Sequence, residues 1–391
     1  MHGVGASVAR ARPTLVPSGS QSGYTWAWTA WTHRTDLIWG QPGSQTRIGG
    51  AGTGVVAILV GRPTGASLRG GGAGAVAVAG GSVVEHLTMG VFHRSLPLLV
   101  AAEHQSFLGQ GLEVDCTPVE SSGQQFADLR SGRYQLVHTA PDNVLNYRLN
   151  PGNALGTTLP VVMVAGMDRG LGLGLMTRSG VRLENFSGRT LSVDAPDSGY
   201  AYVAYALLER RGFARQVDYE VVSHGGAAGR LERLLSGQAD ATLLSGALAL
   251  KGSQAGLQDG ASVGEVANPY LGGAIAVTQP WLEANLDLAL RFLRGFVSAT
   301  RWALDPRNGD RARELLARTH AVDASTAAAL CALEVDAGVG AIPDGQIPTD
   351  AFRNVLALRQ RFAGLETGQD ADILIADAVD RSILEMALAS I

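Results

Sequence analysis

Polar side chains that can bind a small molecule recur directly after short apolar runs of this sequence. In an α/β fold, ligands sit outside the carboxyl ends of the strands, where such side chains gather. The runs ending near residues 93, 116, 138 and 165 predict strands, as do those ending near 193, 222 and 244. The candidate binding residues that follow them are His93, Arg94, Ser95, Ser121, Ser122, Thr139, Asp142, Asn143, Asp168, Asp194, Ser198, Gly199, Tyr200, His224, Gly225 and Ser245.

The residue types in this set favour a ligand with hydrogen-bond donors. Two of the candidates are histidines, which can contact a ring nitrogen or an anion. Asp142, Asp168 and Asp194 would make the site partly acidic. An anionic ligand would then be repelled unless Arg94 and helix N-termini outweigh the carboxylates. We therefore favour a ligand with amine or amidine groups, such as an aminopyrimidine, although each Ser, Thr or Asp taken alone is more often only a helix cap.

Catalytic and metal chemistry find little support in the sequence. Cys116 and Cys331 are far apart and share no metal-type spacing. Covalent catalysis needs a nucleophile beside a base, and nothing brings Cys116 near His138, since both are predicted strand residues. The run GLGLG lacks the strand, loop and helix context of a phosphate-binding motif. We expect no catalytic residues, no metal and no cofactor.

Composition indicates a large globular protein. At 391 residues the chain is long enough for two domains, and 46% of its residues are hydrophobic against 17% charged. The formal net charge is −4 and no basic run occurs, which argues against a nucleic-acid partner. No segment reaches the ~18 consecutive apolar residues of a membrane-spanning helix.

The stretch TLSVDAPDSGYAYVAYALLERRG, residues 190–212, shows the unit from which the body is built. It predicts a strand, a polar loop and a core-facing helix that ends at Gly212. Similar units recur from about residue 85, and strands alternating with helices predict mainly parallel sheets. Two extended runs, residues 170–177 and 272–278, predict crossings between two lobes. Helices follow the second crossing, with a single short helix expected from Asp370 onward.

The first part of the chain differs from this body. Residues 1 to about 82 are rich in Gly, Ala, Ser and Thr and show no helical period, which predicts a disordered low-complexity extension. The segment after Arg10 and Arg12 lacks the apolar core of a signal peptide. We interpret the extension as sequence translated from a misplaced start, with the protein beginning near Val83 or Val84. A genuine disordered extension is the alternative.

An ordered set of motifs resembles one family. LPLLVAAEHQSFLGQGLEV, FADLRSGRYQLV, LENFSGRTLSV, LLSGQADATLLS and QPWLEAN cover residues 86 to about 310. In this order they resemble solute-binding proteins of ABC transporters, of the nitrate, sulfonate and taurine type that includes binders of thiamine-pyrimidine precursors. The resemblance implies a type II periplasmic-binding-protein fold, an α/β fold of two doubly wound lobes that close on a ligand cleft. Lobe I would hold residues 83–168 and 275–391, including the C-terminal helices, and lobe II residues 169–274.

The function implied by this resemblance is ligand capture. We expect a monomeric, non-catalytic protein that binds a small polar organic molecule and delivers it to an ABC permease. The alternative is a cytoplasmic thiamine-pyrimidine-type enzyme or ligand sensor on the same fold, although the cysteine-rich motif of such a synthase is absent. The family is usually extracytoplasmic, but no signal peptide is visible, which leaves the cytoplasm as the alternative. Gln105 and Gln135 also depart from the family pattern, which has glycine and aspartate there.

Overall fold

A computed structural model describes residues 12–17, 24–29, 75–76, 84–364 and 370–391. The chain divides into two compact units, Met1–Leu68 and Arg69–Ile391. The first contains an antiparallel pair of strands that the sequence analysis does not predict, β1 (Arg12–Pro17) and β2 (Tyr24–Thr29). Most of the predicted extension, residues 1 to about 82, and the expected start at Val83 lie outside the described residues. All that follows concerns the second unit.

A mixed sheet forms the centre of lobe I. Its strand order is β3-β4-β6-β13-β7, and β5 pairs with β4. Strands β5 and β6 run parallel to β4, whereas β13 runs antiparallel to both of its neighbours. Helices α1 (Leu96–Glu103), α2 (Ser122–Ser131) and α3 (Pro141–Leu149) follow the first three long strands. The strands are β3 (Ala75–Val76), β4 (Val84–Val91), β5 (Leu112–Pro118), β6 (Leu136–Thr139), β7 (Val161–Asp168) and β13 (Gly273–Thr278).

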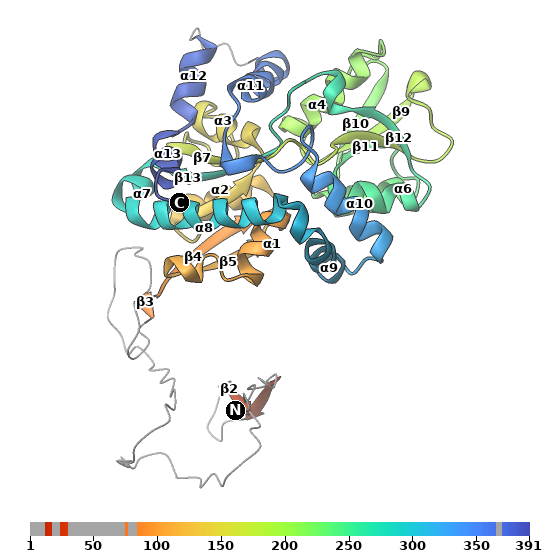
Figure 1. Cartoon of the computed structure of the whole chain (residues 1–391). Helices are drawn as coiled ribbons and strands as arrows, with labels where there is room; N and C mark the ends of the chain where they lie inside the picture. The colour runs from red at the N-terminus through yellow and green to blue at the C-terminus, as the bar shows by residue number, and fades with distance from the viewer. Residues whose placement is uncertain (1–11, 18–23, 30–74, 77–83, 365–369) are drawn as a thin grey trace, which may run out of the picture. The chain divides into compact units, whose positions relative to one another are not determined.

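Lobe II repeats this arrangement in a five-stranded sheet of order β10-β9-β11-β8-β12. The strands are β8 (Gly174–Thr177), β9 (Arg189–Val193), β10 (Tyr219–Ser223), β11 (Ala241–Leu244) and β12 (Gln258–Ser262). Its helices are α4 (Gly199–Glu209), α5 (Ala227–Leu235) and α6 (Gly246–Gln254). In each sheet the strand that arrives from the other lobe, β8 or β13, lies antiparallel among parallel strands. The predicted fold class of two doubly wound lobes is therefore confirmed (Figure 1).

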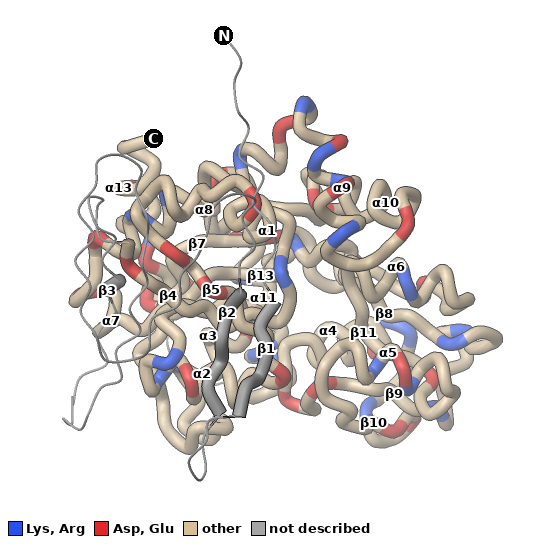
Figure 2. Tube along the Cα trace, turned by 90° about the horizontal axis from the view of Figure 1, so that it is seen from below, with Lys and Arg blue, Asp and Glu red and all other residues tan. Residues whose placement is uncertain are grey.

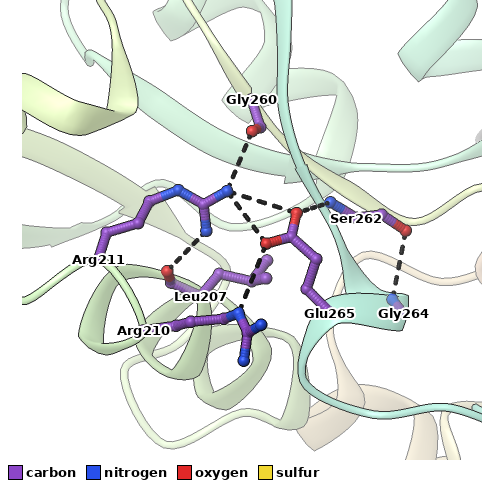
Figure 3. Close-up of polar contacts among 7 residues, drawn as sticks. All are labelled: Leu207, Arg210, Arg211, Gly260, Ser262, Gly264 and Glu265. Carbon is purple, nitrogen blue, oxygen red and sulfur yellow. Dashed lines mark hydrogen bonds and ion pairs between the residues drawn. The ribbon is translucent and has the colours of Figure 1, made fainter.

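A polar network holds the C-terminal end of α4 within lobe II (Figure 3). The Arg211 guanidinium donates to the carbonyls of Leu207 and Gly260, at 3.0 and 3.4 Å, and to the Glu265 carboxylate at 3.1 Å. Glu265 also completes a capping box with Ser262, at the end of β12. Each bond is partly exposed and stabilises little alone. Together they tie α4 to the edge of the sheet and thereby fix where its N-terminus points.

The C-terminal helices cover lobe I and also reach lobe II. Helix α8 lies along α1 (Figure 1), and the Phe107 and Phe292 rings stack at 5.0 Å beside it. Two of these helices contact the second lobe, α10 against α6 and α11 against α4. The helices are α7 (Gln279–Ala284), α8 (Leu286–Leu304), α9 (Gly309–His320), α10 (Ala324–Val335), α11 (Thr349–Ala363), α12 (Ala371–Ala378) and α13 (Ser382–Leu388).

One expectation about this region is wrong. The segment after Asp370 forms two helices, because Val379 leaves the helical path to pair with Met163 of β7. The Asp380 carboxylate then accepts from the Ser382 amide at 3.0 Å and starts α13.

The lobes touch through the N-termini of α3 and α4. Gly199, at the start of α4, lies so close to Asp142 that a Cβ atom at position 199 would overlap the Asp142 side chain. The buried Arg359 of α11 donates to both Asp142 oxygens, at 2.6 and 2.7 Å. Its Nη2 also lies 3.4 Å from the Asp197 carbonyl in lobe II. One guanidinium therefore links α3, α11 and the loop before α4.

Charged residues are mixed over the described surface. Figure 2 shows acidic and basic positions interspersed along both lobes. This pattern differs from that of a nucleic-acid-binding face, which concentrates positive charge. None of the described helices is long and apolar enough to cross a membrane.

Gly199→Ala should hold the two lobes apart. The new methyl group would overlap Asp142, and that side chain cannot withdraw because Arg359 holds both of its oxygens. Buried residues of both lobes share one hydrophobic cluster, so we expect a lower melting temperature and a larger radius of gyration by small-angle X-ray scattering. Gly109→Ala is the matched control, because a Cβ there meets no atom within 4 Å. Equal radii for both variants and the native chain would contradict closure through this contact.

Candidate functional site

Two histidines and an aspartate converge at the strand ends of lobe I. His93 follows β4, His138 lies in β6, and Asp168 ends β7. His138 Nε2 lies 3.9 Å from Asp168 Oδ2, and the rings of His93 and His138 meet edge-on at 4.8 Å. His138 and Asp168 are buried, whereas His93 is exposed. The sequence analysis placed His93 and Asp168 after two strands of this lobe as candidate binding residues, and the structure adds His138 between them.

A glycine in the antiparallel strand makes room for this cluster. Gly273 of β13 lies between β6 and β7. A Cβ atom there would come within 2.5 Å of Asp168 Oδ2 and 2.7 Å of His138 Nε2. Any other residue would fill the space toward which the carboxylate and the imidazole both point. The Gly170 amide donates to Asp168 Oδ1 at 2.8 Å and fixes the other carboxylate oxygen.

Burial shifts the protonation of these groups. It raises the pKa of Asp168 to about 6, although the Gly170 amide opposes the change. It lowers the pKa of His138 to about 3, with His93 adding to the effect. At neutral pH the His138 imidazole is therefore uncharged, and the Asp168 carboxylate is largely ionised. The site presents one buried negative charge beside a neutral imidazole.

A second buried acid lies behind this cluster. Glu334 of α10 accepts from the Leu96 amide, at the N-terminus of α1, at 3.3 Å. Its other oxygen has no hydrogen-bond partner among the described residues, nor does the buried Ser95 hydroxyl. Burial, with a contribution from Asp168, raises the pKa of Glu334 to about 8. Glu334 is therefore largely protonated at neutral pH.

Lobe II contributes an acid, a tyrosine and an arginine. A narrow recess is lined by Ser192, Asp194, Tyr200 and Arg230, with the apolar Val193, Ala201, Ala204 and Leu243. The buried Arg230 donates to the Thr242 hydroxyl at 3.1 Å and to the carbonyls of Gly225 and Leu243 at 2.8 and 3.2 Å. Among the described residues, no carboxylate lies within 4 Å of its guanidinium. Buried charges usually have an ionic partner. The Arg230 guanidinium has none within this distance, so it can still bind an acceptor group of a ligand.

Two tyrosines lie between the acids of the two lobes. Burial raises the pKa of Tyr200, and the charges of Asp168 and Asp194 raise it further. The same carboxylates act on Tyr270, which lies in the segment that leads back to β13. One carboxylate belongs to each lobe, so both tyrosines lie near the junction between the lobes. Both hydroxyls stay protonated at neutral pH and can donate.

The other candidates from the sequence are engaged within their own lobes. The Ser198 hydroxyl donates to Asp194 Oδ1 at 2.5 Å and accepts from the Ala201 amide, as a helix cap does. His224 Nδ1 lies 2.9 Å from the Ser192 hydroxyl. Ser245 precedes α6 and makes no side-chain cap bond. Arg94 donates to the Cys116 carbonyl, Asn143 to the Thr139 hydroxyl, Tyr147 to the Ser122 hydroxyl, and Arg230 to the Gly225 carbonyl.

One expected contribution to the cleft charge is corrected. The sequence analysis counted Asp142 among three acids, but the Arg359 salt bridge uses both oxygens of this carboxylate. Arg359 lies 217 positions further along the chain, so the pairing had no local signal. Of the three expected acids, only Asp168 and Asp194 remain without an arginine or lysine partner within 4 Å in the described chain.

Several site residues were missed by the sequence analysis. Arg230 lies four positions before the buried Leu234, so helical periodicity places it on the inward face of α5. Glu334 likewise follows the buried Leu330 by four positions in α10. A charged residue on an apolar face was the available signal for both. Tyr270 and Gly273 lie in an apolar run and offered none.

Comparison with solved structures identifies known proteins that share this fold. No protein-family model and no curated protein matches the sequence. The periplasmic nitrate-binding protein NrtA from Synechocystis is 13% identical, with 78% of this chain and 89% of that chain covered and a TM-score of 0.67. The alkanesulfonate-binding protein SsuA from Xanthomonas axonopodis is 14% identical, with 76% and 98% covered and a TM-score of 0.59. The chain has the periplasmic-binding-protein fold.

The resemblance inferred from the sequence motifs is thus confirmed at the level of the fold. Another chain with this fold is described as the desulfurization enzyme DSZB; it is 17% identical, with 78% and 99% covered and a TM-score of 0.55. The periplasmic-binding-protein fold therefore accommodates both binders and an enzyme, and function has to be argued from the site.

Glu334→Gln should remove much of the pH dependence of stability. The folded-state pKa of about 8 lies above the ordinary 4.5, so the native chain loses stability as pH rises from about 4.5 through 8. Glutamine keeps the shape without the charge, and the variant should be the more stable by a few kcal/mol at pH 8, at ~1.4 kcal/mol per pKa unit. Urea unfolding in metal-free buffer at both pH values measures this.

The exposed Glu314 supplies the control, and Glu314→Gln should leave the pH profile of the native chain unchanged. Parallel profiles for Glu334→Gln and the native chain would mean that Glu334 is not held as a buried acid.

Proposed function

We propose that this protein captures a small polar organic ligand between its two lobes as the solute-binding component of an ABC-type importer. The observation that carries the proposal is that charged and phenolic groups without an ionic partner come from both lobes at their junction. Asp168 comes from lobe I, and Asp194, Tyr200 and Arg230 come from lobe II. Solved relatives in fold are described as nitrate- and alkanesulfonate-binding proteins, which supports a transport role over an unrelated one.

The charges of the cleft favour a ligand with donors on one edge and an acceptor on another. Asp168 and Asp194 have no lysine or arginine partner, so amine or amidine groups would satisfy them. The Arg230 guanidinium has five N–H groups, and three of its nitrogens already donate within lobe II. The remaining N–H groups can serve one acceptor, such as a ring nitrogen. An aminopyrimidine combines both features.

An enzymatic role on the same fold has weaker support from the geometry. Burial raises the pKa of the Cys116 thiol to about 11, so it is not a ready nucleophile. Cys116 lies in β5 and His138 in β6, on opposite sides of β4. Strands lie ~4.8 Å apart, so roughly 10 Å separates the two backbones. A thiamine-pyrimidine-type enzyme would need another nucleophile.

Capture of a ligand between two lobes also bears on the permease partner, the oligomeric state and the location of the protein. The permease of an importer distinguishes loaded from empty receptors by the closed arrangement of the lobes. A single chain contains both lobes, so a monomer suffices. Function as such a receptor places the protein outside the cytoplasm.

Asp194→Asn should separate the ligand classes. A thermal-shift screen with 4-aminopyrimidine, taurine, nitrate and benzoate identifies a hit, since a ligand at 100 times its Kd stabilises by ~2.7 kcal/mol. Isothermal titration should then show weaker binding of a donor-bearing hit by ~1.5–3 kcal/mol, the contribution of a charged hydrogen bond. An anionic hit should bind more tightly, because a repulsive charge is removed.

Asp197→Asn is the matched control, because Asp197 lies in the same loop with an exposed side chain. It should leave both affinities unchanged. Unchanged affinity in Asp194→Asn as well, with the fold intact, would place the ligand elsewhere.

A further inference from the structure

The His93, His138 and Asp168 cluster has the composition of a metal site. One ligand atom from each residue lies within 4.8 Å of the others. Two imidazoles and one carboxylate form a donor set that proteins use for first-row transition metals, whereas magnesium and calcium prefer oxygen ligands. We propose that these three residues bind one divalent transition-metal ion, such as zinc, at the lobe I side of the cleft. The sequence analysis expected no metal.

The ligand atoms of the three side chains would fit one ion if they moved slightly closer together. Zinc lies ~2.0–2.2 Å from its nitrogen and oxygen ligands, which sets ligand atoms of a tetrahedral site roughly 3.4 Å apart. His138 Nε2 and Asp168 Oδ2 lie 3.9 Å apart, too far for a hydrogen bond between them. Gly273 keeps the space beside both atoms free of a side chain. His93 is exposed, so its ring can turn inward and the ion can enter from the cleft.

Neighbouring groups orient the ligands as metal sites require. A metal-binding imidazole uses its second nitrogen for a hydrogen bond that sets its tautomer. His138 Nδ1 lies 3.4 Å from the His93 carbonyl, which leaves Nε2 facing Asp168. The Gly170 amide holds Asp168 Oδ1, so that Oδ2 is the free ligand atom. Two of the three ligands are thus already aimed at one point.

The Asp168 carboxylate also lacks a cationic partner. It is buried, and no lysine or arginine lies within 4 Å of it in the described chain. Burying a carboxylate without a positive partner is costly, and a divalent ion would offset that cost. The metal site uses groups of lobe I alone but shares Asp168 with the proposed ligand site, so zinc binding is measured in the absence of any organic ligand.

Zinc titration of the full-length, metal-stripped chain tests the site. Calorimetry should show an equivalent of zinc whose affinity falls at least tenfold in His93→Ala and in Asp168→Asn. His93 is exposed, so its loss should leave the fold intact, which the melting temperature checks. His86→Ala is the matched control, because His86 forms a comparable but exposed pair with Asp115 at 2.9 Å. It should bind zinc as the native chain does.

Cobalt provides a second measurement, which reports on metal coordination by the cluster. A residue that only supports the fold would not change this signal. Co²⁺ bound by two imidazoles and a carboxylate at low coordination number should give visible d–d absorption, absent from His93→Ala. Zinc binding that is equal in the native chain and in both cluster variants would overturn the proposal. So would the absence of zinc binding by the native chain.

Discussion

The two crossings between the lobes lie in direct contact, and this contact determines where both sheets end. The Gly272 amide donates to the Asp168 carbonyl at 2.9 Å. A Cβ atom on Gly272 would overlap the Gly170 backbone and the Asp168 carboxylate. Only glycine allows the two segments to approach this closely. Because β7 stops at this point and β8 begins soon after it, the carboxyl ends of both sheets face one cleft.

A second constraint comes from the C-terminal helices. Arg359 of α11 holds Asp142 in lobe I and reaches the Asp197 carbonyl in lobe II, while its guanidinium lies 5.3 Å from the Tyr202 ring. Gln254 of α6 also contacts Thr326 of α10. A buried ion pair adds little net stability but is costly to break, so it specifies one arrangement. These helices therefore favour the closed arrangement in which the polar groups of both lobes meet.

Local sequence patterns predicted the helices and strands better than they predicted the contacts between them. Alternating apolar residues indicated most strands, and the two extended runs indicated the crossings. Strand β12, QDGAS, carries no apolar alternation and depends on its pairing with β8, so it was missed. The pairing of Asp142 with Arg359 spans 217 positions, and no local pattern reports such a contact. The strand-end rule found His93, Asp168 and Asp194, but a buried arginine such as Arg230 becomes visible only when its packing is known.

Hydrogen–deuterium exchange with and without the best screening hit tests most directly whether ligand binds between the lobes. The account predicts slower exchange in both lobes at once, in residues 91–95 and 168–173 of lobe I and in 194–201 and 224–230 of lobe II. The outer helices α9 and α12 should exchange at unchanged rates. Slower exchange confined to one lobe, or confined to the outer helices, would contradict binding in the cleft.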